Sequence, residues 1–245
     1  PDLIIPFSKT KEEAQEALKK FCKGKPLLPP TFISEHHIEE IKGLYVPFWL
    51  YDCSAAGKMR FDATKVKKWT SGDFDYTKTE HYMVIREGGA SFDDVPVNGS
   101  TNMEARYMEA IEPFETKDGK QFQEAYLSGY LADKYNVDSV EAQPRANERV
   151  KKGMEQLLRN TVVGYDTVTT QSSSMRLETG EIRYAMLPVW ILSTKYRGKV
   201  YKFAMNAQTG KFVGELPVSW SKFWGIFALI TGIVTVLGTV LQIFM

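Results

Sequence analysis

The chain has 245 residues, of which 31 are Lys or Arg and 30 are Asp or Glu. Because the charges nearly cancel, the composition excludes a strongly basic nucleic-acid-binding protein and leaves room only for a local basic patch. Two cysteines, Cys22 and Cys53, exclude a disulfide framework and suit a reducing compartment. The chain begins with Pro1 rather than Met, so we expect it to be a piece of a longer product.

The first 30 residues predict a strand, a helix and a linker. Residues 3–7 form a short apolar run typical of a strand. Thr10 and Glu13 have the spacing of a capping box, so a helix is predicted to begin there and to end before Gly24. Prolines at 26, 29 and 30 favour an extended linker after this helix.

The next segment predicts hairpins and a short helix. Residues 44–51 are aromatic and β-branched, and Gly57 is predicted to form the turn of a hairpin. Residues 82–85 predict another strand that ends at Gly88 and Gly89. Asn98 and Gly99 predict a turn, and Thr101 with Glu104 has capping-box spacing for a helix that Pro113 stops.

The second half predicts a long helix followed by a β-meander. Residues 125–135 favour a strand, with a helix as the alternative. Asp138 and Glu141 are placed to cap a helix whose best-formed part is 145–159. The predicted strands of the meander are 161–170, 175–177, 182–195, 200–205 and 211–216. Turns are predicted at 179–180, 197–198 and 209–210.

One pattern occurs twice: a Pro, an amphipathic helix, and a strand with Pro, an apolar residue, Trp and an aliphatic residue. The two strand motifs are Pro47-Phe48-Trp49-Leu50 and Pro188-Val189-Trp190-Ile191. They follow Pro6 and Pro144 by 41 and 44 residues, respectively. We interpret this as a duplicated α+β unit of a helix and an antiparallel sheet, with chance similarity of two buried strands as the alternative.

The predicted units are 1–120 and 121–217, followed by a transmembrane helix at 218–245. Duplication predicts that Trp49 and Trp190 occupy equivalent buried places. Each ring should contact the helix of its own unit, 11–22 for Trp49 and 145–159 for Trp190.

Residues 223–245 contain no charged side chain and are long enough to cross the hydrocarbon core of a bilayer. A core helix of a soluble protein is the alternative, although it would need a polar face. Lys211 and Lys222 precede the span, so the positive-inside rule favours a cytoplasmic body.

Small and polar residues share one stripe of the span at intervals of three and four. The stripe comprises Ala228, Thr231, Gly232, Thr235, Gly238, Thr239 and Gln242. Such stripes let helices approach closely in lipid, so the span is predicted to pair with its own copy or with a partner's helix. The alternative is a passive anchor whose threonines bond to carbonyls one turn earlier.

The sequence contains few residues arranged for chemistry. The histidines, His36, His37 and His81, and the two cysteines lack metal-site spacing, and we expect both thiols to be buried. No nucleophile elbow or phosphate-binding glycine loop occurs, and the adjacent Asp93 and Asp94 favour a solvated surface.

One charged cluster is a candidate binding site. Arg145, Glu148 and Arg149 could bind an anionic partner, with intrahelical ion pairing as the alternative.

Six segments together carry a resemblance to a family: PDLIIPF, KGKPLLP, HIEEIKGLYVPFWLYDC, PRANERVK, YAMLPVWIL and NAQTGKFVGELP. They are similar to the C-terminal region of uncharacterised bacterial zinc-ribbon membrane proteins, often labelled TFIIB-type zinc-ribbon or primosomal replication-restart helicase-like. The resemblance implies zinc only in upstream ribbons with Cys pairs, which this sequence does not contain, and so implies no cofactor here. It supplies no catalytic residues, and no Walker loop supports the helicase label.

Three functions are therefore weighed. The first is a non-enzymatic, membrane-tethered scaffold or regulatory interaction protein that contacts lipid and binds a protein partner. The second is an extracytoplasmic ligand-binding or sensor domain on a C-terminal anchor. The third is an enzyme. A pocket with convergent polar groups would favour an enzyme, whereas a flat, exposed aromatic patch would favour the scaffold.

Overall fold

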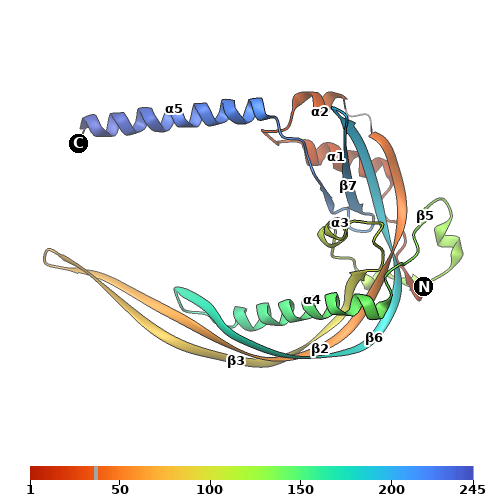
Figure 1. Ribbon diagram of the computed structural model, residues 1–245, viewed down its shortest axis with the longest axis horizontal. Coiled ribbons are helices and arrows are strands. Elements are labelled where there is room, and N and C mark those ends of the chain that lie inside the picture. Colours follow the sequence, from red (N-terminus) through yellow and green to blue (C-terminus); the bar gives the residue numbers. More distant parts are fainter. Residues whose placement is uncertain (36–37, 245) are drawn as a thin grey trace.

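The computed structural model describes residues 1–35 and 38–244, and its strands form one eight-stranded mixed sheet beside five α-helices (Figure 1). The strands are β1 (Leu3–Ile4), β2 (Ile38–Ser71), β3 (Phe74–Asn98), β4 (Lys120–Gln121), β5 (Leu131–Ala132), β6 (Thr167–Tyr196), β7 (Lys199–Asn206) and β8 (Phe212–Gly214). The helices are α1 (Lys11–Cys22), α2 (Pro30–Glu35), α3 (Ala105–Ala110), α4 (Ser139–Asn160) and α5 (Trp220–Phe244), with 3-10 turns η1 (Thr116–Asp118) and η2 (Glu124–Leu127). The two units predicted at 1–120 and 121–217 both contribute strands to this sheet.

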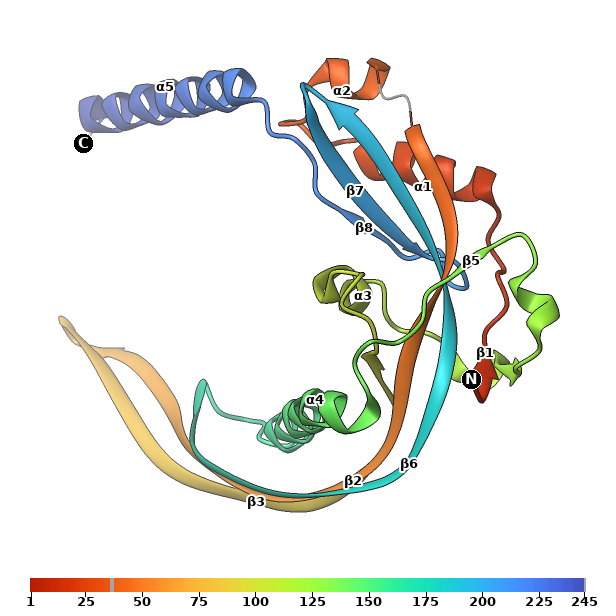
Figure 2. The same cartoon turned by 45° about the vertical axis from the view of Figure 1, so that its right-hand side comes forward.

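Three long strands, β3, β2 and β6, run side by side and curve into an arch, with α4 on its inner side (Figures 1 and 2). The turn predicted at Gly57 is wrong, because Gly57 lies inside β2 and pairs with Gly88 of β3 and Met175 of β6. A Cβ at Gly57 would lie 2.0 Å from the Met175 sulfur. A side chain of the neighbouring strand therefore fills the space at Gly57. The strand end predicted at Gly88–Gly89 is also wrong, because the pairing of β3 with β2 continues through both glycines.

The turn predicted at residues 179–180 is also wrong, since β6 is continuous there. Tyr51 pairs with Ile182 and Cys53 with Thr179, so β6 has an extra residue opposite Asp52. This is a β-bulge, which bends a strand and increases its twist. The turns predicted at 197–198 and 209–210 are confirmed, because Gly198 and Gly210 adopt positive φ angles between neighbouring strands.

The two long helices form where their local signals lie. Thr10 and Glu13 make the predicted capping box of α1, and Asp138 caps α4 by accepting from the amides of Val140 and Glu141. Each helix buries one apolar face, α1 through Ala14, Leu18 and Cys22, and α4 through Ala142, Ala146, Val150, Met154 and Leu158. Both thiols are buried, as predicted.

Three shorter predictions need correction. Pro30 begins α2 inside the predicted linker, which is reasonable because proline suits the first helical position. The helix predicted from Thr101 begins instead at Ala105, and its N-cap is Glu104. Residues 125–135 form η2 and the two-residue β5 rather than one strand, since Gly129 adopts a φ of +85° between them.

Strand pairing relates the two tryptophans of the repeated motif. Val46 of β2 pairs with Leu187 of the antiparallel strand β6. The four-residue motifs that follow these two residues are therefore related by a local two-fold axis through the pair. Trp190 Nε1 donates to the carbonyl of Lys9 at 2.7 Å, and Trp49 Nε1 donates to that of Val137 at 2.9 Å. Each acceptor lies one residue before the N-cap of a helix, α1 and α4 respectively.

Each of these tryptophans packs with the helix that was predicted for the other. Trp190 packs with α1, and Trp49 packs with the cluster that contains α4. The prediction that each ring contacts the helix of its own unit is therefore wrong, because pairing of β2 with β6 brings each tryptophan to the other unit's helix. Trp49 is also only half-buried, unlike Trp190. The duplication itself stays a prediction.

Buried tyrosines make stability depend on alkaline pH. Tyr45 and Tyr51 are almost fully buried, and burial raises the pKa of each phenol to about 12. Between pH 10 and 12 only the unfolded state ionises, so the free energy of unfolding should fall by about 1.4 kcal/mol per pH unit for each tyrosine. Tyr51→Phe should make this fall shallower in denaturant titrations. An unaltered slope for Tyr51→Phe would contradict the prediction.

The C-terminal helix α5 projects away from the sheet (Figure 1). Its segment Trp220–Thr239 is long and apolar enough to cross a membrane, and none of it is buried in the body. The helix begins at Trp220, two residues after the start predicted for the transmembrane helix and three residues before the uncharged stretch, so Lys222 lies in its first turn. Met245, the last residue of the predicted span, lies outside the described residues.

Candidate functional site

The outer end of the β2–β3 ribbon is a two-stranded arm. β6 begins at Thr167, opposite Thr64, so the residues of β2 beyond Thr64 pair only with β3. The arm ends in a two-residue turn at Gly72 and Asp73, where Gly72 supplies the positive φ that such turns require. Figures 1 and 2 show the arm projecting free of the helices. We call residues 65–79 the arm.

Three aromatic side chains at the arm tip face solvent. Trp69 is 49% exposed, Phe74 is 70% exposed and Tyr76 is 44% exposed. Trp69 and Tyr76 pair across the strands and stack with ring centroids 5.4 Å apart. Because Ser71 pairs with Phe74, the Phe74 ring lies on the same face as the stacked pair. Exposed apolar patches of this kind mark interaction surfaces.

Lysines border the aromatic patch on the same face. Lys67, two residues before Trp69, lies opposite Lys78 on the neighbouring strand. Lys65, four residues before Trp69, lies opposite Glu80. Lys78 bonds Glu80 at 2.7 Å, whereas Lys65 lies over the rings of Tyr82 and Tyr165. The face therefore presents an apolar tip followed by a net positive surface, which suits a partner with an apolar patch bordered by carboxylates.

Sequence reasoning missed this patch. The strands predicted at 44–51 and 82–85 lie on either side of the arm, and no element was predicted within residues 65–79. Trp69 and Tyr76 flank Ser71-Gly72-Asp73, a turn signal between alternating residues that could have located the tip. That signal cannot show exposure, because exposure depends on what packs over this face, and the residues of β2 that pack with α4 end at Ala63.

The predicted binding cluster on α4 is divided among separate partners. Arg145 pairs with Glu109, Glu148 pairs with Lys152 at 2.7 Å, and Arg149 pairs with Glu112. The Glu112 interaction raises the pKa of the Arg149 guanidinium further. The side chains thus form no intrahelical network of the three residues, and α4 uses both arginines to hold the segment around α3.

The predicted stripe on α5 is exposed at Ala228, Thr231, Gly232, Thr235, Gly238, Thr239 and Gln242. Thr235 Oγ1 donates to the carbonyl of Thr231 at 2.8 Å, and Thr239 Oγ1 donates to that of Thr235 at 3.1 Å. These are the bonds of the passive-anchor alternative. A Cβ placed at Gly232 or Gly238 meets nothing within 4 Å. Pairing through the stripe stays a prediction.

The adjacent carboxylates Asp93 and Asp94 lie at a second bulge, in β3 opposite Asp52. Asp94 adopts a φ of +55°, its amide donates to Asp52 Oδ1 at 2.9 Å, and its carboxylate pairs with Arg183. These contacts give Asp94 a structural role in holding the bend. Within the described residues, no group of three or more His, Cys, Asp or Glu side chains could hold a metal ion. His36 and His37 lie outside the described residues.

The fold and its C-terminal helix define a mixed α/β protein with one helix that could cross a membrane. The chain is 36% identical over 232 residues to a Bacillus subtilis (strain 168) protein described as "Uncharacterized protein YdjG". The match covers 95% of this chain and 68% of that protein. The chain therefore belongs to the YdjG family.

Two further comparisons found no relative. No family model matches the sequence, and no solved structure matches the chain. The upstream zinc ribbons implied by the resemblance stay a prediction.

Proposed function

We propose that this protein is a membrane-tethered, non-enzymatic scaffold whose arm binds a partner protein. The observation that carries the proposal is the exposed patch of Trp69, Phe74 and Tyr76 at the arm tip. An isolated two-stranded ribbon is only marginally stable in water, and exposed aromatic rings add an unfavourable hydration cost. A partner that covers the patch would remove that cost and hold the ribbon in place.

Anchoring by α5 fixes where this interaction occurs. A span that crosses the bilayer would keep the body at the membrane surface and raise its concentration near membrane partners. We place the body on the cytoplasmic side, because Lys211 and Lys222 precede the apolar segment. The extracytoplasmic sensor is the alternative.

Photocrosslinking from the arm tests the proposal. Benzoylphenylalanine at position 69 or 76 of the full chain, in native membranes, should form a discrete adduct with one protein. Positions 68 and 77 provide matched controls, since Lys68 and Thr77 pair on the opposite face of the same strands. Phe74→Asp should reduce the adduct about tenfold by placing a charge in the apolar contact. Equal adducts from both faces, or adducts with lipid alone, would show that the tip does not dock a protein.

A further inference from the structure

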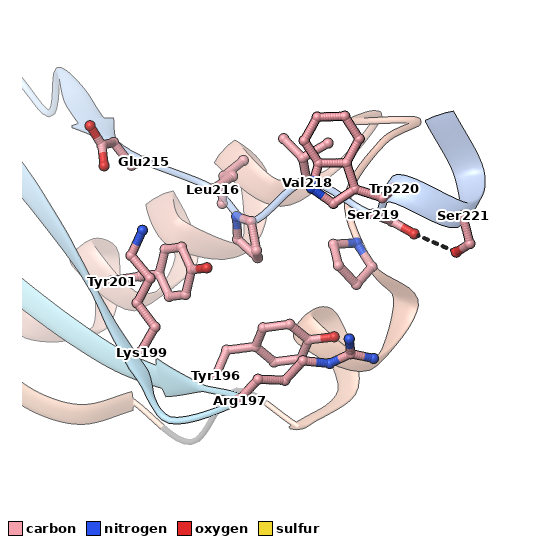
Figure 3. A pocket seen from close by; sticks show the side chains of 12 residues that line it. Tyr196, Arg197, Lys199, Tyr201, Glu215, Leu216, Val218, Ser219, Trp220 and Ser221 are labelled. Carbon is pink, nitrogen blue, oxygen red and sulfur yellow. Dashed lines mark hydrogen bonds between the residues drawn. The ribbon is translucent and has the colours of Figure 1, made fainter. Parts of the chain in front are cut away.

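A cavity of about 760 Å³ lies where the body meets α5 (Figure 3). Tyr196 and Tyr201 form one wall, and the segment from Leu216 to Ser221, which leads into α5, forms the opposite wall. Arg197 and Lys199 extend from the β6–β7 turn into the same space (Figure 3). The cavity thus combines two cations with aromatic and apolar walls.

The two cations have no carboxylate partner among the described residues. Arg197 lies 5.5 Å from the ring centroid of Tyr196, and Lys199 lies 5.3 Å from that of Tyr201. Glu215, the acidic residue of the lining, is paired with Arg106. The charges of Arg197 and Lys199 therefore remain available to an anion that enters the cavity.

The backbone at Arg197 is unusual for an arginine. Arg197 and Gly198 have φ angles of +48° and +78° and form a two-residue turn between β6 and β7. Asn-Gly is the preferred pair in such a turn, because asparagine tolerates the left-handed conformation. The turn requires a positive φ at this position but does not require an arginine, so Arg197 carries backbone strain that asparagine would tolerate better. Strained residues of this kind are common at functional sites.

The cavity is held at the base of the candidate span. The amide of Ser219 donates to the carbonyl of Leu27 at 2.8 Å, and Lys222 Nζ donates to that of Leu28 at 2.8 Å. Trp220 and Trp224 are 67% and 59% exposed on the first turns of α5. Tryptophans mark the headgroup level of a bilayer, so a membrane that receives α5 would place its headgroups beside the cavity.

We propose that this cavity binds the phosphate of an anionic phospholipid headgroup. Arg197 and Lys199 would hold the phosphate oxygens, the tyrosine rings would line the headgroup, and the acyl chains would run along α5. The proposal rests on membrane anchoring, but it concerns which lipid is held and not whether the chain is anchored.

Lipid titration of the purified full chain in detergent micelles tests the proposal. Acyl-labelled phosphatidylglycerol should bind more tightly than acyl-labelled phosphatidylcholine. The double variant R197N/K199Q should weaken phosphatidylglycerol binding by about 30-fold, as expected for the loss of two cations near an anionic headgroup. Asparagine suits the turn, so this variant should fold at least as stably as the native chain. The control K195Q/K202Q removes two exposed lysines of the same strands that do not line the cavity.

The outcomes are distinct. An equal loss in both double variants, or equal binding of the two lipids, would overturn the proposal. Displacement of phosphatidylglycerol by millimolar inorganic phosphate would assign the cavity to a soluble phosphate instead. Carbonate extraction of membranes tests anchoring separately. R197N/K199Q should remain in the membrane pellet. Release of the native chain would reject the membrane anchor, and lipid binding by the cavity would then be decided by the lipid titration alone.

Discussion

Replacing Trp190 with alanine is expected to lower the free energy of unfolding by about 3 to 5 kcal/mol. The ring is 7% exposed and lies among aromatic side chains, 5.2 Å from Phe7 and 6.1 Å from Tyr130 between centroids. Its removal would leave a cavity between α1 and the sheet and would also leave the carbonyl of Lys9 without its donor. Denaturant unfolding of the full chain in micelles, followed by far-UV circular dichroism, measures the loss.

Trp49 provides the matched comparison. It makes the corresponding bond to Val137 but is only half-buried, so Trp49→Ala should cost about 2 kcal/mol. Trp190→Phe should retain most of the packing and lose mainly the hydrogen bond, worth about 1 kcal/mol. If Trp49→Ala cost as much as Trp190→Ala, the difference in burial between the two sites would not govern their stability.

Replacing Arg149 with alanine is expected to destabilise the protein by about 3 kcal/mol. Its guanidinium bonds both oxygens of Glu112, with Nη1 at 2.8 Å from Oε1, and also donates to the carbonyl of Pro96 at 2.6 Å. Glu112 has a side-chain exposure of 12%, so removing its partner would leave a largely buried, unpaired charge. Chemical denaturation of the full chain tests this value.

Arg145 supplies the control from the same helix. It pairs with Glu109, and both side chains are about half exposed, so Arg145→Ala should change stability by less than about 1 kcal/mol. Adding Glu112→Gln to Arg149→Ala should recover part of the loss, because a neutral amide costs less to bury than a carboxylate. Equal effects at the two arginines would show that burial of Glu112 is not the cause.

Elements whose signals are local could be predicted from the sequence. Thr10 and Glu13 set the start of α1 because a capping box satisfies amides within one turn, and Asp138 does the same for α4. The apolar segment that forms α5 could also be predicted, because its length and lack of charge do not depend on neighbours. Burial of the Cys22 and Cys53 thiols could also be predicted, because free cysteine is among the residue types most often buried.

Strand lengths were decided by tertiary structure. Gly57 and Gly72 both interrupt alternating residues, yet Gly57 continues β2 while Gly72 turns the chain. At Gly57 the chain is paired on both sides, with β3 and β6, and the Met175 side chain of β6 occupies the space beside the glycine. A residue more than 100 positions away cannot be recognised from the local pattern. The same limitation produced the false turn at 179–180, where the bulge exists only through pairing with β2.

Both candidate sites also depend on tertiary structure. Trp69 and Tyr76 carry the pattern of ordinary strand residues, and they are exposed because the residues of β2 that pack with α4 on this face end at Ala63. The cavity beside α5 combines Pro29, the β6–β7 turn and the segment before Trp220, which are far apart in the chain. Local sequence specifies capping, turn chemistry and apolar length, whereas the neighbours of a side chain, and thus its burial and its partners, are fixed only when the sheet assembles.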